Sequence, residues 1–169
     1  MEGLLNQLIY KILTSNQSLV TIALQQRAKF EGWLKFELAN ELKKNYADTI
    51  VEYYLKGLNA HVDIYSNRSL IELKTPNTSY KANGCINATK PITDNMNGII
   101  GDIQKLRSIG SKALYAGGYI AFVMFPLDPK STYQQHVNKI KHNIKTGKIV
   151  ETKITINDVD LLIFTAKVF

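Results

Sequence analysis

His61-Val62-Asp63-Ile64-Tyr65 and Leu70-Ile71-Glu72-Leu73-Lys74-Thr75 are two short segments in which apolar and polar residues alternate. Alternation with a period of two predicts half-buried β-strands, in which side chains i and i+2 share a face. We therefore expect Glu72 and Lys74 to point the same way while their apolar neighbours face the core. Asp63 is expected to project from its own strand, away from the core.

These three side chains would meet on one patch of a hairpin, because a tight turn at Asn67-Arg68 joins the two strands. Carboxylate oxygens are the ligands that hard divalent cations prefer. An ammonium group beside them can act on a water molecule and offset developing negative charge. The pattern thus indicates a cation and a water nucleophile, and it suggests phosphodiester hydrolysis.

Composition bounds the class of protein. The chain has 169 residues, which predicts a single domain, 1–169, with a helical segment over about 1–45 and a sheet core over about 49–169. Its 21 Lys and Arg against 14 Asp and Glu give a charge of +7, which favours a polyanionic partner such as DNA.

A lone cysteine, Cys85, excludes an intramolecular disulfide and a cysteine-built zinc site, and it fits a reducing cytoplasm. No apolar run approaches the roughly 20 residues of a membrane span, and we see no secretory signal. We therefore expect a cytoplasmic protein with no membrane partner.

Periodicity along the chain predicts an α/β fold. A long polar loop is expected over 76–97, and the order of elements implies a mixed central sheet flanked by helices. The expected helices are 3–13, about 18–44 with a break near Ala28, 98–109, and one from Asp128-Pro129 to Gly147; the expected strands are 49–55, 61–66, 69–75, a buried one within 117–126, 149–155 and 159–168.

The helix over 28–44 carries acidic residues on an apolar face. On a helical wheel with Phe30 at zero, Glu37 falls at about 340° and Glu41 at about 20°, between Trp33 and Leu34. A buried carboxylate needs a cation or a donor. For Glu41, a structural salt bridge and a functional role are equally compatible with the pattern. Glu37 is our first candidate for function, and Glu31, at the edge of the face, is the fallback.

A helix glutamate, then Asp, then Glu-x-Lys on consecutive strands resembles the pattern of the PD-(D/E)xK nuclease superfamily. The matching residues are Glu37, Asp63, Glu72 and Lys74, and Val62 stands where the family often has proline. The resemblance covers most of residues 28–125 and implies a restriction-endonuclease-like α-β-β-β-α-β core.

The resemblance also implies a mechanism. Asp63 and Glu72 would hold Mg²⁺ or Mn²⁺, with the Leu73 carbonyl as a further ligand and Glu37 binding the same ion through water or a second ion. Lys74 would orient the attacking water or help to deprotonate it. The products would carry a 5′-phosphate and a 3′-hydroxyl.

Several polar residues outside this pattern are candidates for contacts with nucleic acid. The alternative for each residue is that it is simply exposed to solvent and contacts no nucleic acid. Lys139, Lys141 and Lys145 with His142 form a basic helical flank with the same two interpretations. The candidates in the loop and in the helix after the motif strand are Lys81, Lys90, Gln104, Lys105 and Arg107.

Together these features predict a metal-dependent DNA endonuclease of the restriction, repair or mobile-element type. An inactive nucleic-acid-binding module of the same fold and an RNA-directed nuclease are the alternatives, since metal chemistry does not distinguish the two sugars. A double-strand cutter of this size would act most simply as a homodimer, with one site for each strand.

Overall fold

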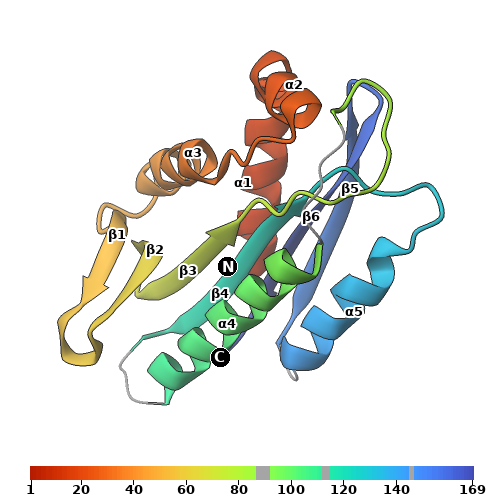
Figure 1. Ribbon diagram of the computed structural model, residues 1–169. Coiled ribbons are helices and arrows are strands. Elements are labelled where there is room, and N and C mark those ends of the chain that lie inside the picture. The colour runs from red at the N-terminus through yellow and green to blue at the C-terminus, as the bar shows by residue number, and fades with distance from the viewer. Residues whose placement is uncertain (87–91, 112–114, 145–146) are drawn as a thin grey trace.

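A six-stranded mixed sheet forms the centre of the molecule (Figure 1). The structure is a computed structural model that describes residues 1–86, 92–111, 115–144 and 147–169. The strand order is β1-β2-β3-β4-β6-β5. The strands are β1 (Ile50–Leu55), β2 (Ala60–Ser66), β3 (Ser69–Lys74), β4 (Gly117–Met124), β5 (Ile149–Ile156) and β6 (Val159–Lys167).

One parallel pair interrupts an otherwise antiparallel sheet. β3 and β4 run in parallel, whereas β1–β2, β2–β3, β4–β6 and β5–β6 are antiparallel. Parallel neighbours need a crossover connection, and here the crossover contains helix α4 (Ile92–Gly110). This connection places α4 beside the strand that carries Glu72 and Lys74.

Helices cover both faces of the sheet (Figure 1). On one face lie α1 (Glu2–Ser15), α2 (Gln17–Gln26) and α3 (Glu31–Lys43); on the other lie α4 and α5 (Tyr133–Ile144). The two faces have separate hydrophobic cores, one including Ile71 and Leu73 and the other including Leu70 and Ile120. None of the described helices combines the length and the apolar character that crossing a membrane requires.

The helices on both faces of the sheet bury β3 more completely than the sequence predicted. β3 was predicted to be half-buried, yet every residue from Ser69 to Leu73 is buried. The alternation of apolar and polar residues in β3 does not mark a face that meets solvent. The polar residue Glu72 lies instead on the buried face that packs against α4. The prediction that β4 is covered on both faces is confirmed, since all eight of its residues are buried.

Most predicted elements are confirmed within a few residues, including the break after α2. Two boundaries were wrong. Helix α4 starts at Ile92 and not at residue 98, because Ile92, Met96 and Ile99 continue its buried stripe into the polar segment. Helix α5 starts at Tyr133 and not at Pro129; the Asp128 carboxylate accepts hydrogen bonds from the Thr132 and Tyr133 N–H groups at 2.8 and 3.0 Å.

Arg27 anchors the segment that follows β3. It ends α2 in the left-handed conformation, with φ 49°, and is buried. Its guanidinium donates hydrogen bonds to the carbonyl oxygens of Thr78, Tyr80 and Ile86. A planar group with five donors suits such an array of acceptors. One side chain therefore fixes the chain from 78 to 86 against the helical layer.

Replacing Arg27 by alanine should destabilise the protein by about 3 kcal/mol, because carbonyl groups lose a charged donor where water has little access. Denaturant unfolding measures this loss. Lys29→Ala removes an exposed cation two residues away and is the matched control. Equal stability of the two variants would contradict the anchoring role.

Candidate active site

The β2–β3 hairpin opens at the motif residues. Its paired register runs from Ser66 and Ser69 to Ile64 and Ile71 and stops there. Beyond that point a side chain takes the place of the backbone hydrogen bonds between the two strands. Asp63 Oδ2 accepts a hydrogen bond from the Leu73 N–H at 2.8 Å. The aspartate is therefore held at the fork between two separating strands, close to β3.

Glu72 lies on the α4 side of β3 and is only 2% exposed. Its Oε1 is 2.5 Å from the Nζ of Lys105 on α4. Lys105 Nζ also lies 3.6 Å from Asp102 Oδ1 and donates to the His61 carbonyl at 3.1 Å. The ammonium thus joins β2, β3 and α4 at the fork.

Lys74 ends β3 and contacts helices from both layers. Its Nζ is 3.3 Å from Glu31 Oε1 on α3 and 3.4 Å from Asp102 Oδ2 on α4. A hydrogen bond from the Phe30 N–H to Thr75 Oγ1, at 3.2 Å, fixes the start of α3 against the end of β3. Since these two residues adjoin Glu31 and Lys74, the bond positions that ion pair.

Lys35, one turn after Glu31 on α3, links the fork to the edge strand. Its Nζ is 3.3 Å from Asp63 Oδ1 and also forms an ion pair with Glu52. Glu52 has φ 50° within β1, at the position facing Asp63 where the paired register is interrupted. Left-handed backbone in a non-glycine strand residue is strained, and such strain concentrates at functional sites.

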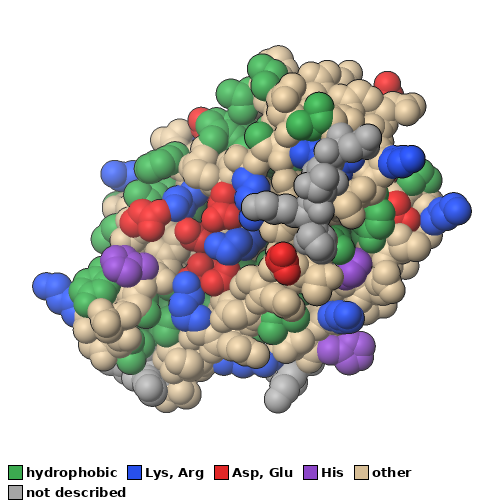
Figure 2. Space-filling model, in the orientation of Figure 1, with side chains coloured by type: hydrophobic (Ala, Val, Ile, Leu, Met, Phe, Trp, Pro, Cys, Tyr) green, Lys and Arg blue, Asp and Glu red, His purple; other side chains and the backbone are tan. Residues whose placement is uncertain are grey.

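These residues form one network, which we name the carboxylate–lysine cluster. Figure 2 shows acidic and basic side chains gathered on this part of the surface, over β2 and β3 and between α3 and α4. The carboxylates outnumber the ammonium groups, so the cluster carries excess negative charge when all are ionised. Its members are Glu31, Lys35, Glu52, Asp63, Glu72, Lys74, Asp102 and Lys105.

Glu72 and Lys74 are members of the cluster whose pKa lies far from its usual value. Burial raises the pKa of Glu72 to about 8; Lys105 opposes this rise, and Asp102 and Asp63 add to it. Burial alone would lower the pKa of Lys74, but the surrounding carboxylates outweigh burial and raise it above its usual value. Lys74 therefore stays protonated here, which does not fit the predicted role in deprotonating water.

Two buried oxygens bear on whether a divalent cation fits. Among the residues that the structure describes, Glu72 Oε1 and Asp102 Oδ2 accept no hydrogen bond of ordinary geometry, and each contacts only a lysine ammonium. Within the described ranges, no three His, Cys, Asp or Glu side chains converge as a metal-binding group. Lysines lie between the carboxylates instead. The oxygens of Asp63, Glu72 and Asp102 are the donors that could hold a hard cation.

The helix carboxylate at the cluster is Glu31, the fallback, and not Glu37. Glu37 is six residues further along α3 and so points about 120° away around the helix. In the part of the chain that the structure describes, it makes no ion pair or hydrogen bond. The buried stripe of α3 is centred on Leu34 and Leu38, and Trp33 is only half-buried, so the predicted face was rotated.

Glu41 has the structural role that we considered. It pairs with Lys44 at 2.5 Å and with Lys11 of α1 at 3.2 Å. These contacts hold the end of α3 to α1 at a distance from the fork. Glu41 therefore does not contribute to the cluster.

Of the predicted nucleic-acid contacts, Lys105 alone joins the cluster through a described contact. Gln104 and Lys81 are exposed, and Arg107 donates to the Asn143 carbonyl on α5. Lys90 lies outside the described residues. On α5, Lys139 and His142 are exposed and Lys141 pairs with Glu151 of β5, while Lys145 again lies outside the described residues.

Sequence reasoning did not assign roles to Lys35, Glu52 or Asp102. Two spacings were available as signals: Lys35 is one turn from Glu31, and Asp102 is one turn from Lys105. Glu52 gave no such signal, because its position depends on the register of β1 against β2.

No protein-family model matches the chain, and comparisons with curated proteins and with solved structures find no match either. The geometry of the carboxylate–lysine cluster is therefore the guide to the function of the protein.

The raised pKa of Glu72 predicts a pH-dependent cost to stability. The folded protein binds a proton at Glu72 more tightly than the unfolded chain does, so the free energy of unfolding falls as pH rises from about 4.5 to about 8. The fall is at most about 1.4 kcal/mol per pH unit. Glu72→Gln should remove it and be more stable than the wild-type protein at pH 8 without metal.

Urea unfolding of both proteins at several pH values tests this expectation. Glu151→Gln, which changes an exposed carboxylate of β5 that pairs with Lys141 of α5, is the matched control. A stability difference between wild type and Glu72→Gln that stays constant from pH 5 to pH 8 would contradict the account.

Proposed function

We propose that this protein is a metal-dependent endonuclease that hydrolyses phosphodiester bonds in DNA. The observation that carries the proposal is the meeting of Asp63, Glu72 and Lys74 at the fork between β2 and β3. Asp102 links the last two residues through the ammonium groups of Lys74 and Lys105. Two carboxylates and a lysine from neighbouring strands resemble the arrangement expected of a PD-(D/E)xK nuclease, and this resemblance supports the proposal.

The order of elements around the cluster supports the same proposal. α3, β1, β2, β3, α4 and β4 follow one another in the α-β-β-β-α-β order, with β3 and β4 parallel. In this order the fork lies between a helix from each layer. Glu31 on α3 supplies a helix carboxylate, although from a different position than expected.

Asp63 and Glu72 would hold Mg²⁺ or Mn²⁺, with Asp102 within the same cluster. When bound, such an ion supplies Lewis acidity toward a phosphate oxygen and a water molecule. The excess negative charge of the cluster and the unfavourable ionisation of Glu72 both favour uptake of a cation. The Leu73 N–H, by donating to Asp63, keeps that carboxylate oriented toward the fork.

Lys74 would act electrostatically. Its ammonium, held between Glu31 and Asp102, can orient a water molecule and stabilise negative charge that develops on the phosphate. The charge of +7 favours approach of a polyanion, and hydrolysis would leave a 5′-phosphate and a 3′-hydroxyl. Cutting both strands would bring two copies of the chain together, one for each strand.

A nucleic-acid-binding module without turnover is the second candidate. The observation in its favour is that lysine ammonium groups contact every carboxylate of the cluster. In that case the lysines would permanently neutralise the acidic groups. DNA would then bind with a strong dependence on salt and remain intact with every metal.

Cleavage of supercoiled plasmid DNA with Mg²⁺ or Mn²⁺ separates the two candidates. Asp63→Asn and Lys74→Ala should each lower the rate by about a hundredfold or more, since each removes a preorganised charge at the reacting phosphate. Glu151→Gln, which breaks an ion pair between α5 and β5, should cleave like the wild-type protein.

Full activity in both site variants would refute the mechanism. Binding without cleavage in either metal would identify the binding module. Competition between DNA and RNA of matched sequence decides which nucleic acid is the substrate, because a DNA enzyme is inhibited far more strongly by the DNA competitor.

A further inference from the structure

Lys105 occupies the position at Glu72 where a divalent cation would bind. Its Nζ lies 2.5 Å from Glu72 Oε1 and 3.6 Å from Asp102 Oδ1, and it donates to the His61 carbonyl at 3.1 Å. Oxygen atoms from three different elements thus surround one ammonium group. This arrangement offers a small cation the same kinds of oxygen that a hard metal ion takes as ligands.

We propose that Lys105 is a displaceable internal counter-ion, which neutralises Glu72 when no metal is bound and withdraws when a divalent cation enters. The inference rests on the proposed function, because it supposes that the cluster takes up a metal ion. It adds a regulatory step: the ion competes with a residue of the protein for the same carboxylate.

Burial of Glu72 explains why such a counter-ion is needed. Glu72 is 2% exposed, and its Oε1 accepts no hydrogen bond of ordinary geometry from the described part of the chain. An isolated buried carboxylate is costly, so the ionised form of Glu72 needs a cation beside it both with and without a bound metal ion. Lys105 is the cation that contacts it among the described residues.

The two lysines on this side of β3 have different surroundings. Lys74 is on the strand and contacts Glu31 and Asp102, and neither of its ion pairs involves Glu72. Lys105 is on α4, with its side chain 35% exposed, so its flexible stem can carry the ammonium outward without moving the backbone. Lys105 is therefore the group that can exchange with a metal ion.

Mn²⁺ affinity, measured by isothermal titration calorimetry without DNA, tests the competition. Lys105→Met keeps the length of the side chain and removes its charge. We expect it to bind Mn²⁺ about tenfold more tightly than the wild-type protein, because no ammonium has to be displaced.

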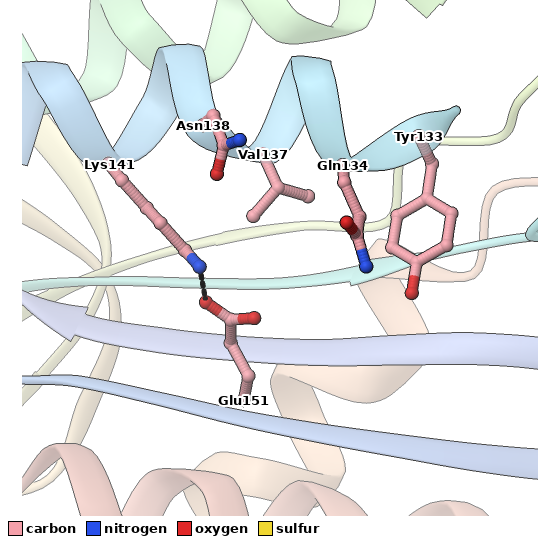
Figure 3. Close-up of a pocket in the computed structure, with 6 residues that line it drawn as sticks. All are labelled: Tyr133, Gln134, Val137, Asn138, Lys141 and Glu151. Atoms are coloured by element: carbon pink, nitrogen blue, oxygen red, sulfur yellow. Dashed lines mark ion pairs between the residues drawn. The ribbon is translucent and has the colours of Figure 1, made fainter. Parts of the chain in front are cut away.

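The matched control is Lys141→Met. Lys141 Nζ also lies 2.5 Å from a carboxylate, Glu151 Oε1, beside a hollow of about 160 Å³ between α5 and β5 (Figure 3). This pair involves no residue of the cluster, so its loss should leave Mn²⁺ affinity unchanged. A similar gain in both variants would show a general effect of net charge and would overturn the proposal.

A second measurement uses the wild-type protein and does not depend on a variant that folds. Reductive methylation, followed by mass spectrometry of peptides, reports how accessible each lysine amine is. Saturating Mn²⁺ should increase the labelling rate of Lys105 several-fold and leave that of Lys141 unchanged. Labelling of Lys105 that is unchanged or slower with Mn²⁺ would overturn the proposal.

The outcomes distinguish this inference from the proposed function. If the wild-type protein binds Mn²⁺ and Lys105→Met binds it equally or more weakly, the counter-ion role is rejected while the metal site stands. If neither protein binds Mn²⁺, both proposals fail. Tighter binding by Lys105→Met, with faster labelling of Lys105 in the wild-type protein, supports the exchange.

Discussion

Burial of the Glu72 carboxylate between a sheet and a helix is the constraint around which the fork is organised. A strand covered on both faces has no solvent to stabilise an ionised side chain, so the charge needs partners from the protein. Lys105 and, through Asp102, Lys74 supply them. The raised pKa of Glu72 shows that these partners compensate burial incompletely. An additional cation would offset the remaining cost of burying the ionised Glu72 carboxylate.

The topology brings the partners together. The β2–β3 ladder ends early, which frees Asp63 to bind the Leu73 N–H. The crossover from β3 to β4 places α4 over Glu72, and the bond from Phe30 to Thr75 fixes α3 over Lys74. The bond between Asp63 and Leu73 is local in sequence, whereas Phe30 and Thr75 are 45 residues apart. The combination of these connections assembles charged side chains from β1, β2, β3, α3 and α4 at one place.

Sequence patterns predicted most of the fold, because period-two and helical patterns mark strands and helices directly. They also singled out Asp63, Glu72 and Lys74. The helix glutamate was misassigned, because Trp33 extended the predicted apolar face toward Glu37, whereas the buried stripe follows Leu34, Leu38 and Leu42. Glu52 received no role, since its proximity to Asp63 depends on strand register. The spacing of Asp102 from Lys105 was visible, but its proximity to Lys74 depends on the path of the crossover. Such tertiary relations leave no local pattern in a single sequence.

The central claim is that the carboxylates at the β2–β3 fork bind a divalent cation. Anomalous X-ray diffraction from crystals soaked in Mn²⁺ locates such an ion directly. The account predicts an anomalous peak within coordination distance of both Asp63 and Glu72, with the Lys105 ammonium moved away from Glu72. No peak at the fork of a well-ordered, Mn²⁺-soaked crystal, with Lys105 still against Glu72, would contradict it.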